Sequence, residues 1–393
     1  LDGNSLGLLS LDAEQAVQTV VEQWKEYVIG GYSLPRPDSW YYMGEDLGAL
    51  MAPLVGAAPD EIVATGTTTV NLHQLLATFY EPSNPRRKIV ATSLDFPTDI
   101  YALKSHIHLH GGHPPRDLIR IASPDGRTIR EKDIITALDE TVAVVLLPSV
   151  LYRSGQLLDI ARLTAAAHAC GAVIGFDCSH SVGAVPHRLH ESGADFAVWC
   201  SYKYLNGGPG AVAALYVHRR HHRRTPGLAG WWGNEKSTQF DMAHDFRPSG
   251  DAGAWQISSN PQLSAAPLRA SLQMFREIGI EAVRAKSLEM TSFLMELVDQ
   301  ISGPPYRYSV GNPRESGRRG GHVAVEHDEA ARICKALKAR GVVPDFRMPE
   351  VIRLAPVALY NTFHEVWRTV QHLKAIIDRR EYEQFPQGRD LIA

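Results

Sequence analysis

Two segments of the chain place reactive side chains where a buried strand is expected to end. Lys203 follows the apolar run 196–200, and Asp177 closes the apolar run 172–176. A lysine that loses hydration at a strand end is more easily neutral and can attack a carbonyl, although a lone lysine there is more typical of the surface. A strand-terminal carboxylate beside such a lysine suits pyridoxal phosphate, because the carboxylate holds the pyridinium proton and the lysine forms a Schiff base.

A run of hydroxyls could serve the phosphate of such a cofactor. The segment 65–69, Thr-Gly-Thr-Thr-Thr, precedes a helical pattern of leucines that begins at Leu72. Free N–H groups and hydroxyls at a helix start form a phosphate site, but the same pattern equally describes an ordinary N-cap.

The composition favours a globular protein that acts on a small molecule. The chain has 393 residues, 44% apolar and 21% charged, and its net charge of -3 gives no reason to expect nucleic-acid binding. No apolar run approaches the length of a membrane span, and no signal peptide is recognised before Leu1. The four cysteines form no CxxC pair and are expected to be reduced packing residues, so we expect a cytoplasmic location.

Two histidine-rich stretches could suggest other functions. His106, His108, His110 and His113 lack a convincing carboxylate partner, so we expect a polar helix end and no metal. The basic run 218–224 is expected to be a solvated face rather than a nucleic-acid patch.

The elements that must position these residues alternate between strand and helix. Apolar runs predict strands, and 3.6-residue periodicity predicts helices between them, with one long helical stretch from 263 to 297 and a capping box at Thr362. This alternation predicts an α/β fold with a mainly parallel sheet and a site outside the carboxyl ends of its strands. We expect a large domain over 44–262, and a smaller α+β domain formed by 1–43 and 263–393.

The amino-acid sequence resembles that of kynureninase, a fold-type I pyridoxal-phosphate hydrolase. The similar segments are ordered along nearly the whole chain: Leu1 to Gly7, Thr69 to His73, Phe96 to Asp99, Ser154 to Gln156, the Asp177 and Lys203 segments, Gly230 to Gly233, and Pro356 to Asn361. So many ordered matches are more specific than any single motif.

The resemblance implies a role for each matching residue. It implies cofactor contacts from Thr68, Thr69, Phe96, Asp99, Ser149, Asp177, His180, Tyr202, Lys203, Trp231 and Asn260. Phe96 would stack on the cofactor ring and Asp99 would supply a carboxylate beside it. His180 would support Asp177, and Tyr202 would deliver a proton, so that Lys203, Tyr202 and Asp177 are the expected catalytic residues.

The resemblance also implies how the substrate is held. Arg353 would bind the α-carboxylate, and Asn260, Tyr32 and Asn234 would lie near the aryl ring. Tyr32 and Asn234 depart from common members, several of which carry histidine there. The loops of Trp231 and Asn260 would reach the other subunit's cofactor, which implies a homodimer with shared sites.

The implied reaction is hydrolytic cleavage of the Cβ–Cγ bond of a kynurenine, which releases alanine and an anthranilate. The preferred ring substituent stays open: none, 3-hydroxy or methyl. The runner-up is a cysteine desulfurase-like lyase, which would need a mobile cysteine in the small domain, whereas Cys334 falls in an expected helix. A pyridoxal-phosphate-binding protein without catalysis is the third alternative, although binding alone would not require Arg353.

Overall fold

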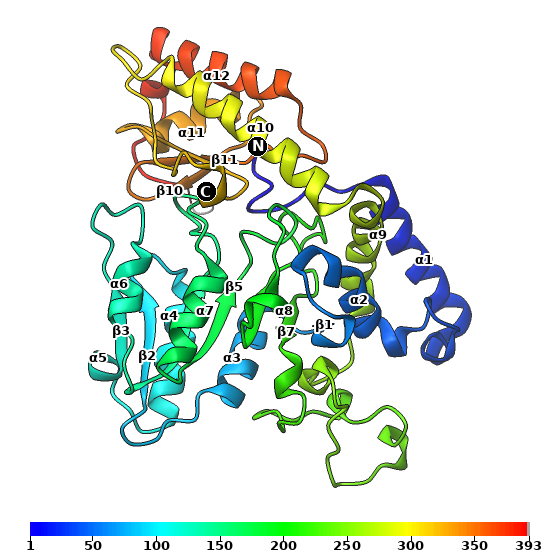
Figure 1. Ribbon diagram of the computed structural model, residues 1–393. Coiled ribbons are helices and arrows are strands. Elements are labelled where there is room, and N and C mark those ends of the chain that lie inside the picture. The colour runs from blue at the N-terminus through cyan, green and yellow to red at the C-terminus, as the bar shows by residue number, and fades with distance from the viewer. Residues whose placement is uncertain (391–393) are drawn as a thin grey trace.

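A seven-stranded sheet forms the centre of the larger of two lobes in the computed structural model, which describes residues 1–390 (Figure 1). The strand order is β1-β7-β6-β5-β4-β2-β3, and β7 runs in the opposite direction to the other strands of this sheet. The strands are β1 (Ile62–Ala64), β2 (Lys88–Thr92), β3 (Leu118–Ile121), β4 (Val142–Pro148), β5 (Val173–Asp177), β6 (Phe196–Trp199) and β7 (Ala214–Val217). The expected α/β fold with a mainly parallel sheet is therefore confirmed.

Helices cover both faces of this sheet because its strands are apolar on both sides. One face packs against α3 (Thr68–Phe79) and α4 (Pro97–Leu109), and the other against α2 (Met43–Val55), α7 (Ile160–Ala169) and α9 (Gln262–Ile278). Shorter or peripheral helices complete the lobe: α1 (Leu11–Tyr27), α5 (Pro114–Asp117), α6 (Glu131–Thr136) and α8 (Leu189–Ser192).

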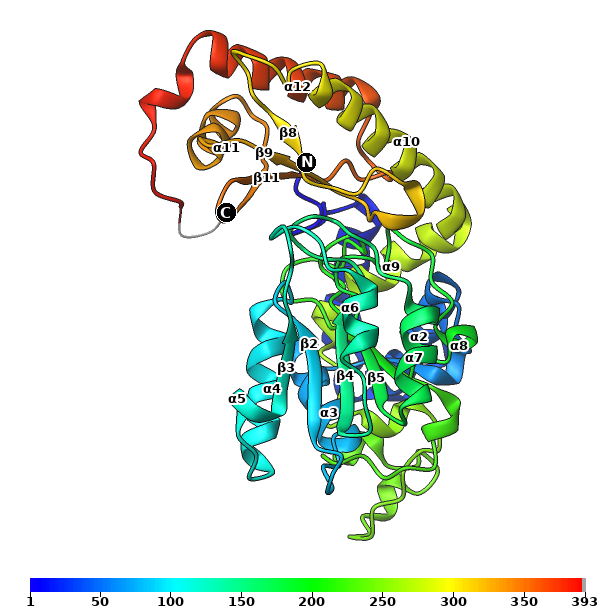
Figure 2. The same ribbon diagram turned by 60° about the vertical axis from the view of Figure 1, so that its left-hand side comes forward.

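The smaller lobe is an antiparallel sheet with helices. Its strand order is β10-β11-β9-β8, formed by β8 (Ser309–Val310), β9 (Val323–Glu326), β10 (Asp345–Arg347) and β11 (Val351–Leu354). The helices α10 (Ile280–Asp299) and α12 (Phe363–Asp378) lie side by side on its outer side, and α11 (Ala330–Ala339) completes its core (Figure 2).

Local sequence explains where these helices begin and end. The Thr362 hydroxyl accepts the Glu365 N–H, and the Glu365 carboxylate accepts the Thr362 N–H, so the predicted capping box is confirmed. The expected single helix from 263 to 297 is wrong, because Gly279 adopts a φ of +81° and breaks it into α9 and α10.

The hydrophobic cores divide the chain differently from the expected domain boundary. Val20 of α1 and Leu268, Leu272 and Phe275 of α9 belong to the core of the larger lobe, whereas the separate core of the smaller lobe begins at Met290 in α10. The packing therefore changes from one lobe to the other along α10, not at residue 263, because α1 and α9 bury their apolar faces against α2 and each other.

The fold brings the strand ends that carry the expected site residues to one edge of the large sheet. Strands β2, β4, β5 and β6 are parallel, so their carboxyl ends meet at the edge of the large sheet that faces the smaller lobe (Figure 1). Within the described range, no helix combines the length and apolar character that crossing a bilayer requires.

Candidate active site

A cavity of about 200 Å³ lies at this edge, between the two lobes. Most of the expected site residues line it: Thr68, Thr69, Phe96, Asp177, His180, Tyr202, Lys203 and Arg353. Five further residues line it that the sequence did not indicate: Asn4, Ser5, Thr98, Ser179 and Arg347. The residues come from both lobes, so the cavity exists only because the smaller lobe covers the strand ends.

Lys203 and Asp177 face the cavity from adjacent strand ends. Lys203 Nζ lies 2.9 Å from Nε2 of His180, whose ring is buried. Asp177 Oδ1 accepts a hydrogen bond from the Ser179 N–H at 2.9 Å. The Ser179 backbone N–H thus contacts the carboxylate, and His180 contacts the lysine.

Burial and positive neighbours keep His180 neutral. Desolvation is the main reason that the pKa of His180 lies well below its ordinary value, and the charges of Lys203 and Arg353 lower it further. A neutral imidazole can accept a hydrogen bond from an ammonium group, which a protonated imidazole cannot. His180 can therefore hold the Lys203 side chain toward the cavity.

Two more carboxyl groups lie behind Asp177. Asp95 accepts hydrogen bonds from the Thr92 N–H and hydroxyl, and burial raises its pKa to about 7. Asp99 is buried, and neither of its carboxyl oxygens has a partner within residues 1–390. Burial, followed by the charges of Asp177 and Asp95, raises the pKa of Asp99 well above its ordinary value. Neither Asp95 nor Asp99 lines the cavity itself.

The start of α3 presents hydroxyls and free amides. Thr68 and Thr69 are its first residues, and the Thr69 hydroxyl lies 3.3 Å from that of Thr98, at the start of α4. The first N–H groups of a helix have no intrahelical partner, so two helix starts offer donors to an anion here. Phe96, 43% exposed, lines the cavity, and its ring is roughly perpendicular to that of Tyr152.

A pair of arginines forms the wall on the side of the smaller lobe. Arg353 is fully buried, pairs with Asp345 on the neighbouring strand, and donates to the Tyr152 carbonyl at 2.7 Å and to the Ser5 hydroxyl at 3.2 Å. Arg347 also pairs with Asp345. Both guanidinium groups contact Asp345, and the charge of Asp2 also acts on both, so this wall offers charged N–H donors of the kind that bind a carboxylate ligand.

Ser149 lies near the cavity without lining it. Its side chain is buried and shares a hydrogen bond of 2.7 Å with the Ser181 hydroxyl, and its N–H donates to the Asp177 carbonyl at 2.8 Å. In this geometry Ser149 fixes the strand end that carries Asp177.

Four expected residues lie outside this cavity. Tyr32 packs edge-on against Trp232, and Trp231 and Asn234 line a second cavity with the loop 238–247. Asn260 is buried, and with its amide turned over it donates to the Ala64 carbonyl and accepts the Gly44 N–H. None of these four lines the cavity that holds Lys203. The chain at about 235–250, yellow-green in Figure 1, forms a loop that projects from the end of the large lobe opposite the smaller lobe.

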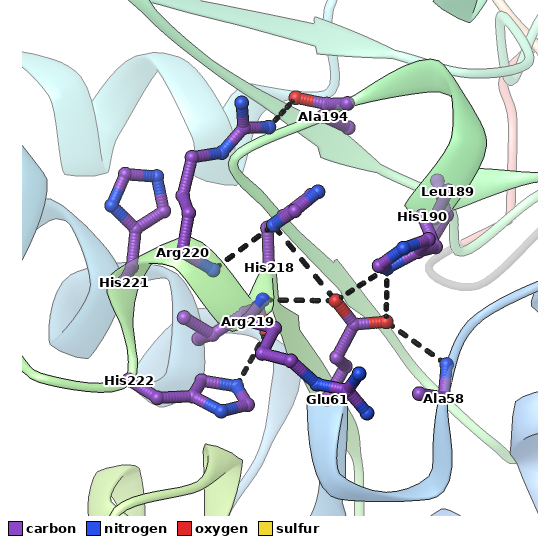
Figure 3. Close-up of polar contacts among 12 residues, drawn as sticks. Ala58, Glu61, Leu189, His190, Ala194, His218, Arg219, Arg220, His221 and His222 are labelled. Atoms are coloured by element: carbon purple, nitrogen blue, oxygen red, sulfur yellow. Dashed lines mark hydrogen bonds and ion pairs between the residues drawn. The ribbon is translucent and has the colours of Figure 1, made fainter.

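The basic run 218–224 is solvent-exposed at Arg219, Arg220 and Arg223, as the sequence suggested, but it also makes buried contacts. His222 is buried, and the Arg219 N–H donates to the fully buried carboxylate of Glu61 (Figure 3). His190 Nδ1 also contacts this carboxylate at 2.8 Å, with His218 stacked on the His190 ring. These bonds tie β1, β7 and α8 together, a role that a charge run alone could not reveal.

This Glu-His-His group has donors suited to a metal, but they are already engaged. The two Glu61 oxygens accept backbone N–H groups from Ala58 and Arg219, and His218 Nδ1 accepts the Arg220 N–H at 3.1 Å. Burial alone would raise the pKa of Glu61, yet these backbone bonds and His190 bring it below its ordinary value. The geometry is that of a stabilised buried carboxylate.

The other conspicuous side chains do not converge on a site. His106 is buried in α4, where its Nε2 lies 3.1 Å from Nδ1 of His73, while His108 is exposed. Cys334 is buried within α11, and burial raises the pKa of its thiol to about 12. Such a thiol is neither mobile nor ionised, unlike the nucleophile of a desulfurase.

The fold is shared with solved pyridoxal-phosphate and desulfurase structures. An apo cysteine desulfurase from Thermococcus onnurineus NA1 superimposes with a TM-score of 0.80 at 17% identity, covering 96% of this chain and 94% of that one. A cystine C-S lyase, C-DES, in complex with cysteine persulfide gives 0.79 at 17% identity, covering 95% and 96%. At this identity the likeness establishes the fold, and confirms the expected fold-type I architecture.

Proteins related by sequence are much more similar to this chain than these solved structures are. The chain is 54% identical over its whole length to a kynureninase from Geobacillus thermodenitrificans (strain NG80-2) and to one from Bacillus cereus (strain ATCC 10987 / NRS 248), each covered over 91% of its length. Residues 283–373 match the family model described as the kynureninase C-terminal domain. This chain therefore belongs to the kynureninase family.

Proposed function

We propose that the protein is a pyridoxal-phosphate-dependent hydrolase that cleaves the Cβ–Cγ bond of L-kynurenine or 3-hydroxykynurenine, releasing an anthranilate and L-alanine. One observation carries the proposal: a lysine, a strand-end carboxylate, two helix starts and two arginines line one cavity. The family relationship supplies the reaction, and the cavity supplies groups suited to each part of it.

The cofactor is pyridoxal 5'-phosphate, and the donor set of the cavity fits it. Thr68 and Thr69, at the start of α3, would hold the phosphate. Asp177 would hold the protonated ring nitrogen, and Phe96 would cover a face of the ring. Lys203 Nζ is the amine for its carbonyl. Bound pyridoxal phosphate supplies electron withdrawal from the α-carbon of the substrate.

The residues of this chain then move protons. Lys203, released by the substrate amine, transfers the proton at the α-carbon, and His180 orients its side chain. Tyr202 lines the same cavity, and burial, followed by Cys200, raises its pKa above the ordinary value. Tyr202 therefore stays protonated and acts as an O–H donor near the γ-carbon when water adds there.

Arg353 would receive the substrate α-carboxylate. Its side chain is held by Tyr152, Ser5 and Asp345 before any ligand arrives. Such preorganisation lowers the entropy cost of binding and aligns the α-carbon with Lys203.

We propose a homodimer in which Trp231 and Asn260 complete the site of the other subunit, with Tyr32 and Asn234 nearer the aryl ring. In support, the projecting loop exposes large apolar side chains, with Phe240 66% and Met242 67% exposed. Exposed apolar groups of this size are typical of interfaces. The unpaired cysteines, Cys170, Cys178, Cys200 and Cys334, further support a cytoplasmic location.

The test is a product assay on purified protein with added cofactor. Plain, 3-hydroxy and ring-methylated kynurenines are compared by kcat/KM, with alanine and the aromatic product quantified together. Equimolar products from at least one of these substrates are expected. A protein that binds the cofactor but forms neither product from any of them would overturn the reaction.

A further inference from the structure

Asn4 is a buried amide without partners inside the cavity. Its side chain is 0% exposed and lines the cavity with Lys203 and Arg353. Within residues 1–390, neither Oδ1 nor Nδ2 of Asn4 makes a hydrogen bond. Leaving a buried polar group unpaired costs roughly 1–3 kcal/mol, so such a group in a cavity wall indicates a ligand that pairs with it.

The position of Asn4 follows from how its loop is tied at both ends. On one side, Asp2 forms a bridge with Ala355, which lies two residues beyond Arg353. On the other side, the Gly7 N–H donates to the carbonyl of Tyr202 at 2.8 Å, next to Lys203. The loop therefore crosses from the arginine to the lysine, and Asn4 lies between these two anchors in the chain.

The neighbouring donors point to the group that Asn4 meets. Ser5 accepts from Arg353 Nη2 at 3.2 Å and donates to Asp345 at 2.7 Å, so Asn4 adjoins the arginine wall. Arg353 Nε is also buried without a partner among the described residues. Two unused N–H donors therefore belong to this wall, where a carboxylate can accept both.

We propose that Asn4 is a substrate-binding residue whose side-chain amide donates to the α-carboxylate of the bound amino acid, beside Arg353. The inference rests on the proposed function, because it takes the ligand to be an α-amino acid held between Lys203 and Arg353. It assigns to Asn4 a specificity for the carboxylate, independent of the γ-carbonyl and the aryl ring.

Binding to the holoenzyme tests this with two ligands that share the amine. L-Alanine carries the α-carboxylate but no γ-carbonyl, whereas decarboxylated kynurenine carries the γ-carbonyl and ring but no carboxylate. Each is titrated while the visible absorbance of the bound cofactor is followed. Asn4→Ala is expected to raise the Kd of L-alanine ~10-fold or more, the effect of losing a hydrogen bond to a charged group. The Kd of decarboxylated kynurenine should stay within twofold.

Further variants separate binding from folding. Asn4→Asp should weaken L-alanine binding more than Asn4→Ala because it places like charges together, and Asn4→Ser should recover part of the affinity. The thermal unfolding temperature of Asn4→Ala without ligand should not fall, since no internal bond is lost; if that variant is unstable, Asn4→Ser and Asn4→Asp decide.

Three results would overturn the inference: unchanged L-alanine affinity in Asn4→Ala, an equal loss for both ligands, or no binding of L-alanine to the unaltered holoenzyme. An Asn4→Ala variant that binds the cofactor more weakly but binds L-alanine with unchanged affinity would also contradict the inference. An enzyme that binds L-alanine through Asn4 yet cleaves no kynurenine would remove the proposed reaction and leave this inference standing.

Discussion

Replacing Arg353 by lysine tests the arginine wall while keeping its charge. Nη1 of the guanidinium donates to the Tyr152 carbonyl, Nη2 contacts both Ser5 and Asp345, and Nε stays available to a ligand. An ammonium group has one nitrogen on a flexible stem, so it cannot hold Asp345 and also offer a fixed N–H donor to the substrate.

The expected loss follows from the bonds at stake. A hydrogen bond between charged groups contributes about 1.5–3 kcal/mol net, so losing one bond to the substrate carboxylate at ~2 kcal/mol lowers kcat/KM ~30-fold. Because the α-carboxylate is held equally before and during bond cleavage, most of this change should appear as a higher KM rather than a lower kcat.

Steady-state kinetics with the best of the three kynurenines measures this, with Arg314→Lys as the matched control. Arg314 pairs with Asp299 on the surface, where both side chains are 50% exposed, so that exchange should leave kcat/KM unchanged. An Arg353→Lys enzyme with kcat/KM within threefold of the original would refute the assignment of Arg353 to the carboxylate.

Three other outcomes are expected. Glu61→Gln should lower the free energy of unfolding by about 2 kcal/mol at neutral pH, because it weakens hydrogen bonds to a buried carboxylate. The pKa of Glu61 in the folded protein lies below its ordinary value, so the stability that its carboxylate contributes is lost as pH falls through the folded-state pKa. The difference in free energy of unfolding between the variant and the original protein should therefore shrink at low pH. A difference that stays constant between pH 7 and 3 would be inconsistent with this. The Cys334→Ala variant should retain kynurenine cleavage. A folded Cys334→Ala variant that no longer cleaves kynurenine would revive the desulfurase alternative. Mixing inactive Lys203→Ala and Trp231→Ala subunits should restore activity through hybrid dimers with one complete site, and mixtures that exchange subunits but stay inactive would argue against shared sites.

The sequence predicted the part of the site that depends on strand ends. Asp177 and Lys203 each follow an apolar run, and parallel strands bring such ends to one edge. The hydroxyls at Thr68 and Thr69 could be placed because a helix start follows them directly. These inferences needed only local pattern and the general geometry of a parallel sheet.

The remainder depends on contacts between distant segments. Arg347 enters the cavity because β10 pairs with β11, and Asp345 lies opposite Arg353 in that register. Glu61 contacts His190 and His218, which lie far from it in the sequence and are connected to it by no local pattern. Asn4 lies inside the recognised segment Leu1 to Gly7, but its use is indicated by the fold, which places its unpaired amide in the cavity wall.

The most direct test of the central claim is to locate the cofactor on the chain. The holoenzyme is reduced with borohydride, digested, and the peptides are analysed by mass spectrometry. A pyridoxyl-phosphate label on Lys203, absent from Lys203→Ala together with the visible absorbance and alanine release, is the predicted result. A label on any other lysine of the unaltered protein, or no label despite bound cofactor, would contradict the account.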